Sequence, residues 1–240
     1  MKNWPIHERL YVDIDAGAPG ERGRLMHRVK TIELAHKIMG TGVGLMVGSD
    51  VISWGYGIID EIREKRVPCW VNLNSSDSQA RLAQDGSFLS ELRPEAVTIS
   101  CLSSVPALAA FKAVQGCEVL GMAALDHMPD DEIASLFNCD PIDAVLALAR
   151  RACMAGLDGW VASSRCALQI VKMSTAMSMT IKDVRPRWSL GPQDDPKSFL
   201  TPDKAFSLGA DRILVGEAIA NALDPRDAVL RTLEEISKRA

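Results

Sequence analysis

The sequence predicts an α/β protein with a (β/α)8 barrel, built as a single domain over residues 1–240. Short apolar runs alternate eight times with segments of helical spacing, which is typical of parallel strands joined by helices. Several runs are almost continuous in Val, Ile and Leu, as expected for parallel strands that are buried on both faces. No linker or low-complexity segment divides the chain, and its length matches one such barrel.

Each predicted strand is a short apolar run that stops at polar or turn-forming residues. In chain order the strands are RLYVDID (9–15), GVGLMV (42–47), CWVNLN (69–74), AVTISC (96–101), CEVLGMAAL (117–125), LDGWVAS (157–163), MSMTIKDV (177–184) and DRILVG (211–216). The intervening segments repeat their apolar residues at helical spacing. They are 22–39, 54–66, a stretch before residue 96, 104–116, 131–137 with 141–156, 164–173, 201–209 and 224–239.

The alternative architecture is a doubly wound open sheet. That fold commonly carries a glycine-rich GxGxxG turn after its first strand or a phosphate-binding loop with a lysine. Neither motif occurs in the chain. The barrel is therefore the favoured prediction.

Composition excludes several functional classes. The net charge is −4, from 27 basic and 31 acidic residues, and no segment is strongly basic, so we expect no nucleic-acid partner. No run of eighteen apolar residues is present and the first ten residues do not resemble a signal peptide, so we expect no membrane partner. The six cysteines form no CxxC pair and lie far from the four histidines. We therefore expect no metal, no cofactor and no disulfide, and a reduced, cytoplasmic location.

Polar residues at the ends of the predicted strands are the candidate site, because chemistry in such barrels lies at the carboxyl ends of the strands. Asp13 and Asp15 are two apart on the first strand and so point to the same side; alternatively, Asp13 faces outward. The third strand ends in two amides, Asn72 and Asn74, and a carboxylate, Asp77, follows. These amides are either part of a site or structural hydrogen-bonding groups.

Later strand ends add further candidates. The fourth strand ends at Ser100 and Cys101, and we expect this cysteine to be a packing residue. After the fifth strand, Asp126 and His127 are an acid/base pair or solvated loop residues. After the eighth strand, Gly216 begins either an anion-binding turn or an ordinary strand–helix turn.

The last unit, TPDKAFSLGADRILVGEAIANALDP (201–225), resembles the C-terminal signature of the orotidine 5'-monophosphate decarboxylase superfamily, whose fold is the ribulose-phosphate-binding barrel. The resemblance continues through most of the chain. RLYVDID is similar to the family's first strand, AALDHMPDDEI to its fifth-strand loop, and AGLDGWVASS to its sixth strand. IKDVRP with GPQDD is similar to its strand-seven phosphate loop.

The resemblance implies which residues correspond to the family's Lys-Asp-Lys-Asp catalytic array. The strand-two lysine position matches Gly42, and the strand-three D-x-K-x-x-D motif matches Asn72, Asn74 and Asp77. Both lysines are then absent. Asparagine donates hydrogen bonds but has no proton to transfer. Since one oxyanion-stabilising donor is worth ~10²–10³ in rate, ordinary orotidylate decarboxylation is not expected.

The same resemblance places a phosphate near strands seven and eight. Asp15, Gln193 and Gly216 match the residue types that the family uses, whereas Glu217 stands where the family has an arginine. Either the ligand has no phosphate, or a cation offsets the glutamate, or Glu217 itself closes the turn. Lys182, Arg185 and Lys197 are the basic residues in or after the seventh strand.

The sequence thus predicts a divergent family member active in nucleotide metabolism. One hypothesis is a metal-free carbon–carbon lyase that acts on a small nucleoside- or sugar-like molecule, phosphorylated or not. In it Asp15, Asn72, Asn74 and Asp77 are catalytic, and Asp13, Ser100, His127, Lys182, Arg185, Gln193, Gly216 and Glu217 bind the substrate. The alternative is a non-catalytic ligand-binding or partner subunit. The family's dimers imply a homodimer in which Asp77 reaches the partner's site. The segment VISWGYGII (51–59) belongs either to this dimer contact or to the core.

Overall fold

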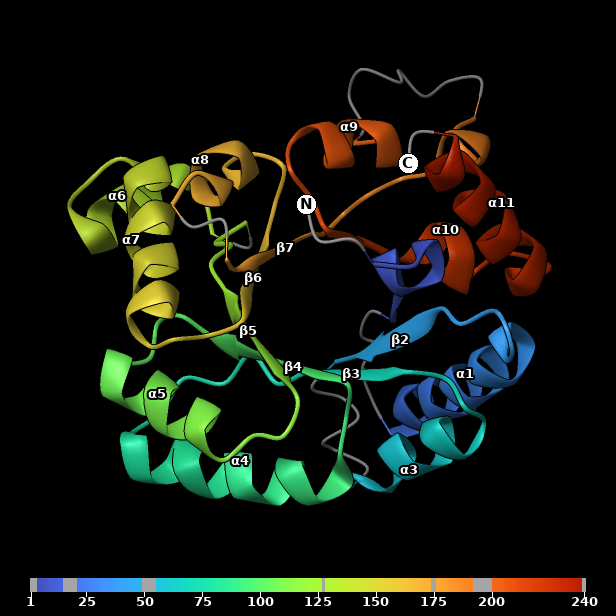
Figure 1. Ribbon diagram of the computed structural model, residues 1–240, viewed down its shortest axis with the longest axis horizontal. Helices are drawn as coiled ribbons and strands as arrows, with labels where there is room; N and C mark the ends of the chain where they lie inside the picture. The colour runs from blue at the N-terminus through green and yellow to red at the C-terminus, as the bar shows by residue number, and fades with distance from the viewer. Residues whose placement is uncertain are drawn as a thin grey trace.

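The fold is a closed barrel of eight parallel strands surrounded by helices, and it confirms the predicted class (Figure 1). It is seen in a computed structural model that describes residues 4–14, 21–48, 55–126, 128–173, 176–191 and 200–238. Neighbouring strands pair in chain order, and β8 returns to pair with β1. No helix among these residues is both long and apolar enough to cross a bilayer.

The elements follow the predicted alternation. The strands are β1 Leu10–Ile14, β2 Gly44–Val47, β3 Cys69–Asn72, β4 Ala96–Ser100, β5 Glu118–Met122, β6 Gly159–Ala162, β7 Ser178–Ile181 and β8 Arg212–Val215. The α-helices are α1 Glu21–Ile38, α3 Gly57–Glu64, α4 Gln79–Leu92, α5 Val105–Ala113, α6 Asp130–Phe137, α7 Pro141–Met154, α8 Ala167–Val171, α9 Pro202–Ser207, α10 Glu217–Ala220 and α11 Pro225–Ser237. Short 3-10 turns lie at Ile6–Arg9 (η1) and Arg187–Ser189 (η2).

Several strands are shorter than predicted at their carboxyl ends. β3 ends at Asn72 instead of residue 74, and β7 ends at Ile181 instead of residue 184. The polar residues that follow are therefore loop residues at the mouth of the barrel. Apolar pattern alone does not locate this boundary, because the residues just after a strand alternate in the same way.

Several helices begin where the sequence provides an N-cap. The side chains of Ser78, Ser104, Asp140 and Asp224 each accept a hydrogen bond from a backbone N–H in the first turn. Such caps satisfy donors that have no partner inside the helix, and each stabilises it by about 1 kcal/mol. Proline in the first turn of α5, α7 and α11 strengthens the same start signal.

The core has two layers that follow from strand alternation. Side chains such as Val12, Val71 and Ile181 pack outward against the helices in the larger apolar cluster. The residues between them point into the barrel, where Tyr11, Met46, Trp70, Leu120 and Leu214 belong to a separate inner cluster. The direction of every inner side chain near the mouth follows from this alternation.

Candidate functional site at the carboxyl end of the barrel

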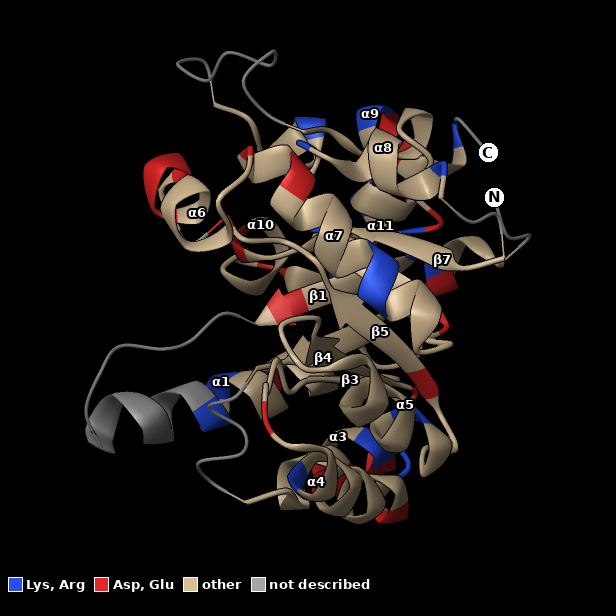
Figure 2. Ribbon diagram, turned by 90° about the vertical axis from the view of Figure 1, so that its left-hand side faces the viewer, with Lys and Arg blue, Asp and Glu red and all other residues tan. Residues whose placement is uncertain are grey.

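The carboxyl ends of the strands carry polar side chains on the inner face. Asp13 follows Tyr11 by two residues and Asn72 follows Trp70 by two, so each continues the inner face of its strand. On β7 the outward Met179 and Ile181 leave Thr180 facing inward. Asp13 thus faces the interior, as predicted, and the acidic residue of β1 is visible in Figure 2.

Three buried side-chain oxygens at this end have no hydrogen-bond partner among the described residues. They are Asn72 Oδ1 on β3, Thr180 Oγ1 on β7 and Ser163 Oγ directly after β6. A buried polar atom without a partner costs about 1–3 kcal/mol, so such atoms are rare and require an explanation. At the carboxyl end of a (β/α)8 barrel, the explanation we favour is a ligand that supplies the missing hydrogen bonds.

Asn74 was predicted to be the last residue of the third strand, but it lies in the loop after β3. The backbone N–H groups of Leu73 and Asn74 both donate to the carbonyl oxygen of Thr98, at 3.1 and 3.0 Å, so two residues oppose one. Asn74 has a φ of 42°, in the left-handed region that asparagine tolerates, and its side chain is exposed. The two amides therefore do not lie on the same face of a strand: Asn72 is on the inner face and Asn74 is an exposed loop residue.

Asp77 and Ser100 are engaged in local hydrogen bonds. Asp77 is exposed, and its Oδ1 accepts from the backbone N–H of Ser78 at 2.6 Å, just before α4. Ser100 is buried, and its Oγ accepts from the N–H of Leu102 at 3.3 Å in the turn after β4. Both contacts order turns at the mouth. They also leave the Asp77 carboxylate accessible to solvent.

Lys182 continues the inner face of β7 and meets two carboxylates. Its ammonium nitrogen lies 3.2 Å from Asp126 Oδ2, after β5, and 3.1 Å from Asp183 Oδ2. Burial by itself lowers the pKa of Lys182, but the attraction of Asp183 and Asp126 outweighs it and raises the pKa above its ordinary value. The side chain is therefore a cation at neutral pH. Lys182 was one of the basic residues considered as the cation that offsets Glu217. The structure instead pairs it with Asp126 and Asp183.

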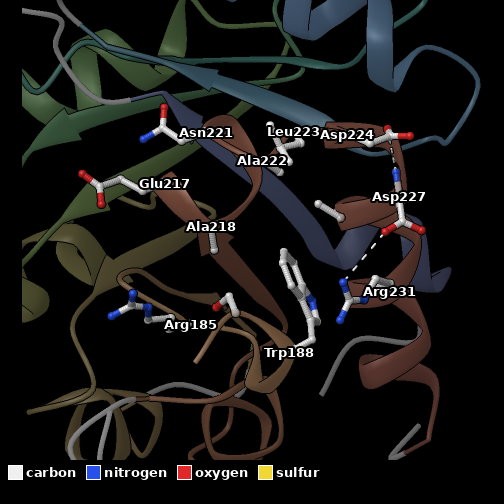
Figure 3. Close-up of a pocket in the computed structure, with 12 residues that line it drawn as sticks. Arg185, Trp188, Glu217, Ala218, Asn221, Ala222, Leu223, Asp224, Asp227 and Arg231 are labelled. Carbon is white, nitrogen blue, oxygen red and sulfur yellow. Dashed lines mark hydrogen bonds and ion pairs between the residues drawn. The ribbon is translucent and has the colours of Figure 1, made fainter. Parts of the chain in front are cut away.

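Glu217 and Arg185 line a groove between the β7 loop, α10 and α11 (Figure 3). The groove has a volume of about 520 Å³. Trp188 forms one wall, with the guanidinium of Arg231 4.7 Å from its ring centroid. Glu217 is exposed and has no ion-pair partner among the described residues. A carboxylate thus stands where the resemblance placed a phosphate-binding arginine.

Gly216 and Gly42 lie at opposite ends of the barrel. Gly216 follows β8 at the mouth, and a Cβ there would lie 3.5 Å from the carbonyl oxygen of Asp13, which is ordinary contact. Gly42 precedes β2, so it lies at the amino end and is the wrong match for a catalytic position. The inner residue near the carboxyl end of β2 is Met46. It is uncharged, so the expected absence of a strand-two lysine is unchanged.

Some predicted residues lie outside the described part of the chain. They are Asp15, His127 and Gln193, together with Lys197 and residues 51–54 of the proposed dimer segment. Their roles stay predictions.

Thr180 and the ion pair of Asp126 with Lys182 were not predicted from the sequence. The alternation on β7 identifies Thr180 as an inner residue once the strand boundary is known. The contact between Asp126 and Lys182 joins residues far apart in sequence, and no local pattern signals it.

The cysteines behave as packing residues where they are buried. Cys69 and Cys101 are fully buried, and burial raises the pKa of the Cys101 thiol to about 12. No disulfide joins the six cysteines, and no group of three or more His, Cys, Asp or Glu side chains in the described ranges is arranged to hold a metal ion. The thiolate of Cys101 is thus disfavoured at neutral pH, which agrees with its assignment to packing.

Comparisons with known proteins identify the relatives of the chain, although no family model matches it. The orotidine 5'-phosphate decarboxylase of Methylococcus capsulatus is 28% identical over 235 residues, which are 97% of this chain and 93% of the relative. The enzyme of the same name from Pseudomonas paraeruginosa is 27% identical over 198 residues, covering 79% and 84%.

Solved structures agree on the fold. The orotidine 5'-phosphate decarboxylase of Lactobacillus acidophilus superposes with a TM-score of 0.76 at 20% identity, covering 95% of this chain and 99% of that one. An uncharacterized conserved protein from Geobacillus kaustophilus gives a TM-score of 0.77 at 18% identity, with the same coverage. At these identities the superpositions show the (β/α)8 fold. Together with the sequence relatives, which match over most of the chain, they support membership of the orotidine 5'-phosphate decarboxylase superfamily.

Proposed function

We propose that this protein is a carbon–carbon lyase that acts on a small nucleoside- or sugar-like molecule at the carboxyl end of its barrel. The observation that carries the proposal is the pair of buried, unpartnered oxygens, Asn72 Oδ1 and Thr180 Oγ1, on the inner face of a barrel from a decarboxylase superfamily. Unsatisfied groups at this end reduce stability, and binding a polar ligand offsets that loss.

The reaction differs from ordinary orotidylate decarboxylation. The named relatives are orotidine 5'-phosphate decarboxylases, and our matching places neutral Asn72 and Asn74 where that family has an aspartate and a lysine. Met46 occupies the inner face of β2. Neither β2 nor β3 supplies an ammonium group there, and the ammonium of Lys182 on β7 is already offset by Asp126 and Asp183. Little positive charge is therefore left at the mouth to stabilise a nascent carbanion. In the proposed site Asn72 orients the reacting group, and Asp13 orients hydroxyl groups of the substrate. Asp15 and Asp77 complete the proposed catalytic set, and Asp77 acts across a homodimer interface.

The test begins with a thermal-shift panel of nucleosides, nucleotides, sugars and sugar phosphates. We expect the melting temperature to rise with at least one nucleoside or sugar, and we expect breakdown of that ligand to be detectable by mass spectrometry. Carbon dioxide release from orotidine 5'-phosphate should be slower than in the Methylococcus relative by several orders of magnitude, from the ~10²–10³ assigned to each lost donor. Turnover at the relative's rate contradicts the proposal.

The phosphate corner gives a second test. Glu217→Arg restores the residue type that the family resemblance places there and removes a carboxylate from the groove that Arg185 also lines. A bidentate guanidinium–phosphate contact is worth about 1.5–3 kcal/mol, so this variant should bind uridine 5'-phosphate roughly ten- to a hundredfold more tightly than the wild type. Isothermal titration measures the gain. Glu217→Gln is the matched control, because it removes the charge without adding a donor fork.

A non-catalytic partner subunit is the second candidate. The exposed carboxylate of Asp77 favours it, because that group has only a local contact within the single chain. Tyr56 of the predicted dimer segment packs edge to face on the exposed Phe88, with ring centroids 4.6 Å apart, and the pair adds apolar surface there. No shift with any ligand of the panel, together with a stable complex with another protein, favours this candidate. The homodimer and the cytoplasmic location stay predictions.

A further inference from the structure

Lys182 points into the barrel mouth from β7. Met179 and Ile181 pack outward in the larger core, so Thr180 and Lys182 alternate with them on the inner face. The ladder continues past the strand end, because the backbone N–H of Lys182 donates to the carbonyl oxygen of Ala162 at 3.1 Å. The side chain thus starts from the wall of the barrel and not from a solvated loop.

Lys182 faces Asn72 across the mouth. Strand pairings followed through β4, β5 and β6 connect Asn72 to Thr98, Leu120, Gly159 and finally Ser178. The register of a (β/α)8 barrel shifts by about eight residues over one full turn, and so by about four over half a turn. The residue of β7 at the height of Asn72 is therefore Lys182. Thr180, whose hydroxyl has no described partner, lies just below it on the same wall.

The charge of Lys182 is already offset. An ammonium group has three N–H donors, and Asp126 and Asp183 lie within reach of two of them, at 3.2 and 3.1 Å. One donor remains for a ligand. The local sum of one cation and two carboxylates is negative, and Asp13 on β1 and Glu217 after β8 are further carboxylates at the same end.

These charges bear on the kind of ligand that this mouth accepts. Among the described residues at these strand ends, the carboxylates of Asp13, Asp126, Asp183 and Glu217 outnumber the nearby cations Lys182 and Arg185. A phosphate dianion or a carboxylate placed there adds to this excess of negative charge. Asn72 Oδ1 accepts a hydrogen bond, the Thr180 hydroxyl accepts or donates, and Lys182 donates. Hydroxyl, carbonyl and N–H groups of an uncharged ligand satisfy this set without adding negative charge.

We propose that the carboxyl end of the barrel selects an uncharged nucleoside- or sugar-like ligand, with Lys182, Asn72 and Thr180 as its hydrogen-bonding groups. The inference rests on the proposed function for the place of the site, and it names the substrate class. The Lys182–Asp126–Asp183 cluster is the specificity element: the two aspartates hold the lysine as a donor and remove its attraction for anions.

The test measures binding by isothermal titration with three probes that share the uridine skeleton: uridine is uncharged, orotidine adds a carboxylate to the base, and uridine 5'-phosphate adds a phosphate to the ribose. Wild-type protein should bind uridine about tenfold more tightly than either anionic probe. The variant Asp126→Asn with Asp183→Asn should lose or reverse that preference, because the lysine charge is then no longer offset. Asparagine suits position 183, whose φ is 60°.

Two further variants make the result specific. Lys182→Met should weaken uridine binding at least tenfold while the melting temperature shows that the barrel is folded. Asp158→Asn is the matched control, because Asp158 pairs with Lys112 at 2.5 Å at the other end of the barrel, and it should leave the preference unchanged.

Tighter binding of an anionic probe by the wild type, no binding of any probe, or an unchanged preference in the double variant overturns the inference. Failure of the proposed function is a separate result: uridine-type ligands bind as described but undergo no reaction.

Discussion

The two ends of the barrel interior differ in whether their buried polar groups have hydrogen-bond partners. At the amino end, Arg212 is buried and pairs with Glu118, which also accepts from the Ser178 hydroxyl at 2.8 Å. The guanidinium stacks 5.2 Å from the ring centroid of Trp70. At the carboxyl end, Asn72 Oδ1 and Thr180 Oγ1 are buried without a described partner.

This difference is the one expected between a structural plug at the amino end, made of Arg212, Glu118 and Ser178, and the proposed binding site at the carboxyl end. The amino-end groups satisfy one another almost completely; the exception is Arg212 Nε. Buried charges are stable only when paired in this way. The carboxyl-end groups have hydrogen-bonding capacity that no described residue uses and that a ligand can use. The two ends should therefore respond in opposite ways to the removal of polar atoms.

The largest effect should come from the amino-end plug. Arg212→Met removes one partner of a buried ion pair and leaves Glu118 charged in the interior. We expect a loss of about 3–5 kcal/mol in the free energy of unfolding, or roughly 10 °C in melting temperature. Urea unfolding measures it. A loss below about 1 kcal/mol would show that solvent reaches this end and that the plug is not structural.

Alkaline pH probes the same end through Tyr11. Burial raises the pKa of Tyr11 to about 12 from 10.0, with smaller contributions from Glu95 and Glu118, while Arg212 opposes the rise. Since the folded-state pKa exceeds the unfolded one, this contribution is complete below pH 10 and is lost as the pH rises toward 12. The loss should be about 2–3 kcal/mol. Tyr11→Phe should remove this part of the alkaline destabilisation. If stability falls with rising pH equally in the wild type and in Tyr11→Phe, burial of Tyr11 is not a cause of the alkaline destabilisation.

Two threonines give the sharpest contrast between an inner hydroxyl group with a hydrogen-bond partner and one without. Thr98 and Thr180 are both fully buried inner residues, but Thr98 Oγ1 accepts from Trp70 Nε1 at 2.6 Å, whereas Thr180 Oγ1 has no described partner. Thr98→Val should cost about 1–3 kcal/mol, because the indole N–H loses its acceptor. Thr180→Val should be neutral or stabilising by about 1 kcal/mol, and it should weaken ligand binding. Equal losses in the free energy of unfolding of the two variants would contradict the different roles assigned to Thr98 and Thr180.

The smallest effect should come from the rim of the amino end. Lys112→Met breaks the pair with Asp158, whose side chains are 27% and 33% exposed. Because solvent screens such a pair, we expect a loss of at most about 1 kcal/mol, measured in the same urea titrations. A loss as large as that of Arg212→Met would mean that the burial of an ion pair does not determine how much its removal destabilises the protein.

The sequence predicted the architecture because apolar runs and helical spacing are local signals. All eight strands were located, and the inward direction of Asp13 and Asn72 followed from alternation. Asn74 was placed incorrectly, because the two-against-one pairing at Thr98 ends β3 early and is invisible in the residue pattern.

The ion pairs of Lys182 with Asp126 and Asp183 were also not predicted. Asp126 and Lys182 approach only through the closure of the barrel from β5 to β7, so their contact depends on register and not on local sequence. Gly42 was mismatched for a related reason: a short glycine-containing motif fits either end of a strand until the pairing of β1 with β2 fixes its height.

The most direct test of the central claim is a crystal structure with the ligand that raises the melting temperature most. The account predicts ligand electron density at the carboxyl end of the barrel, with polar ligand atoms within hydrogen-bonding distance of Asn72 Oδ1, Thr180 Oγ1 and the Lys182 ammonium. Density elsewhere, with these three groups paired to protein atoms, would contradict it.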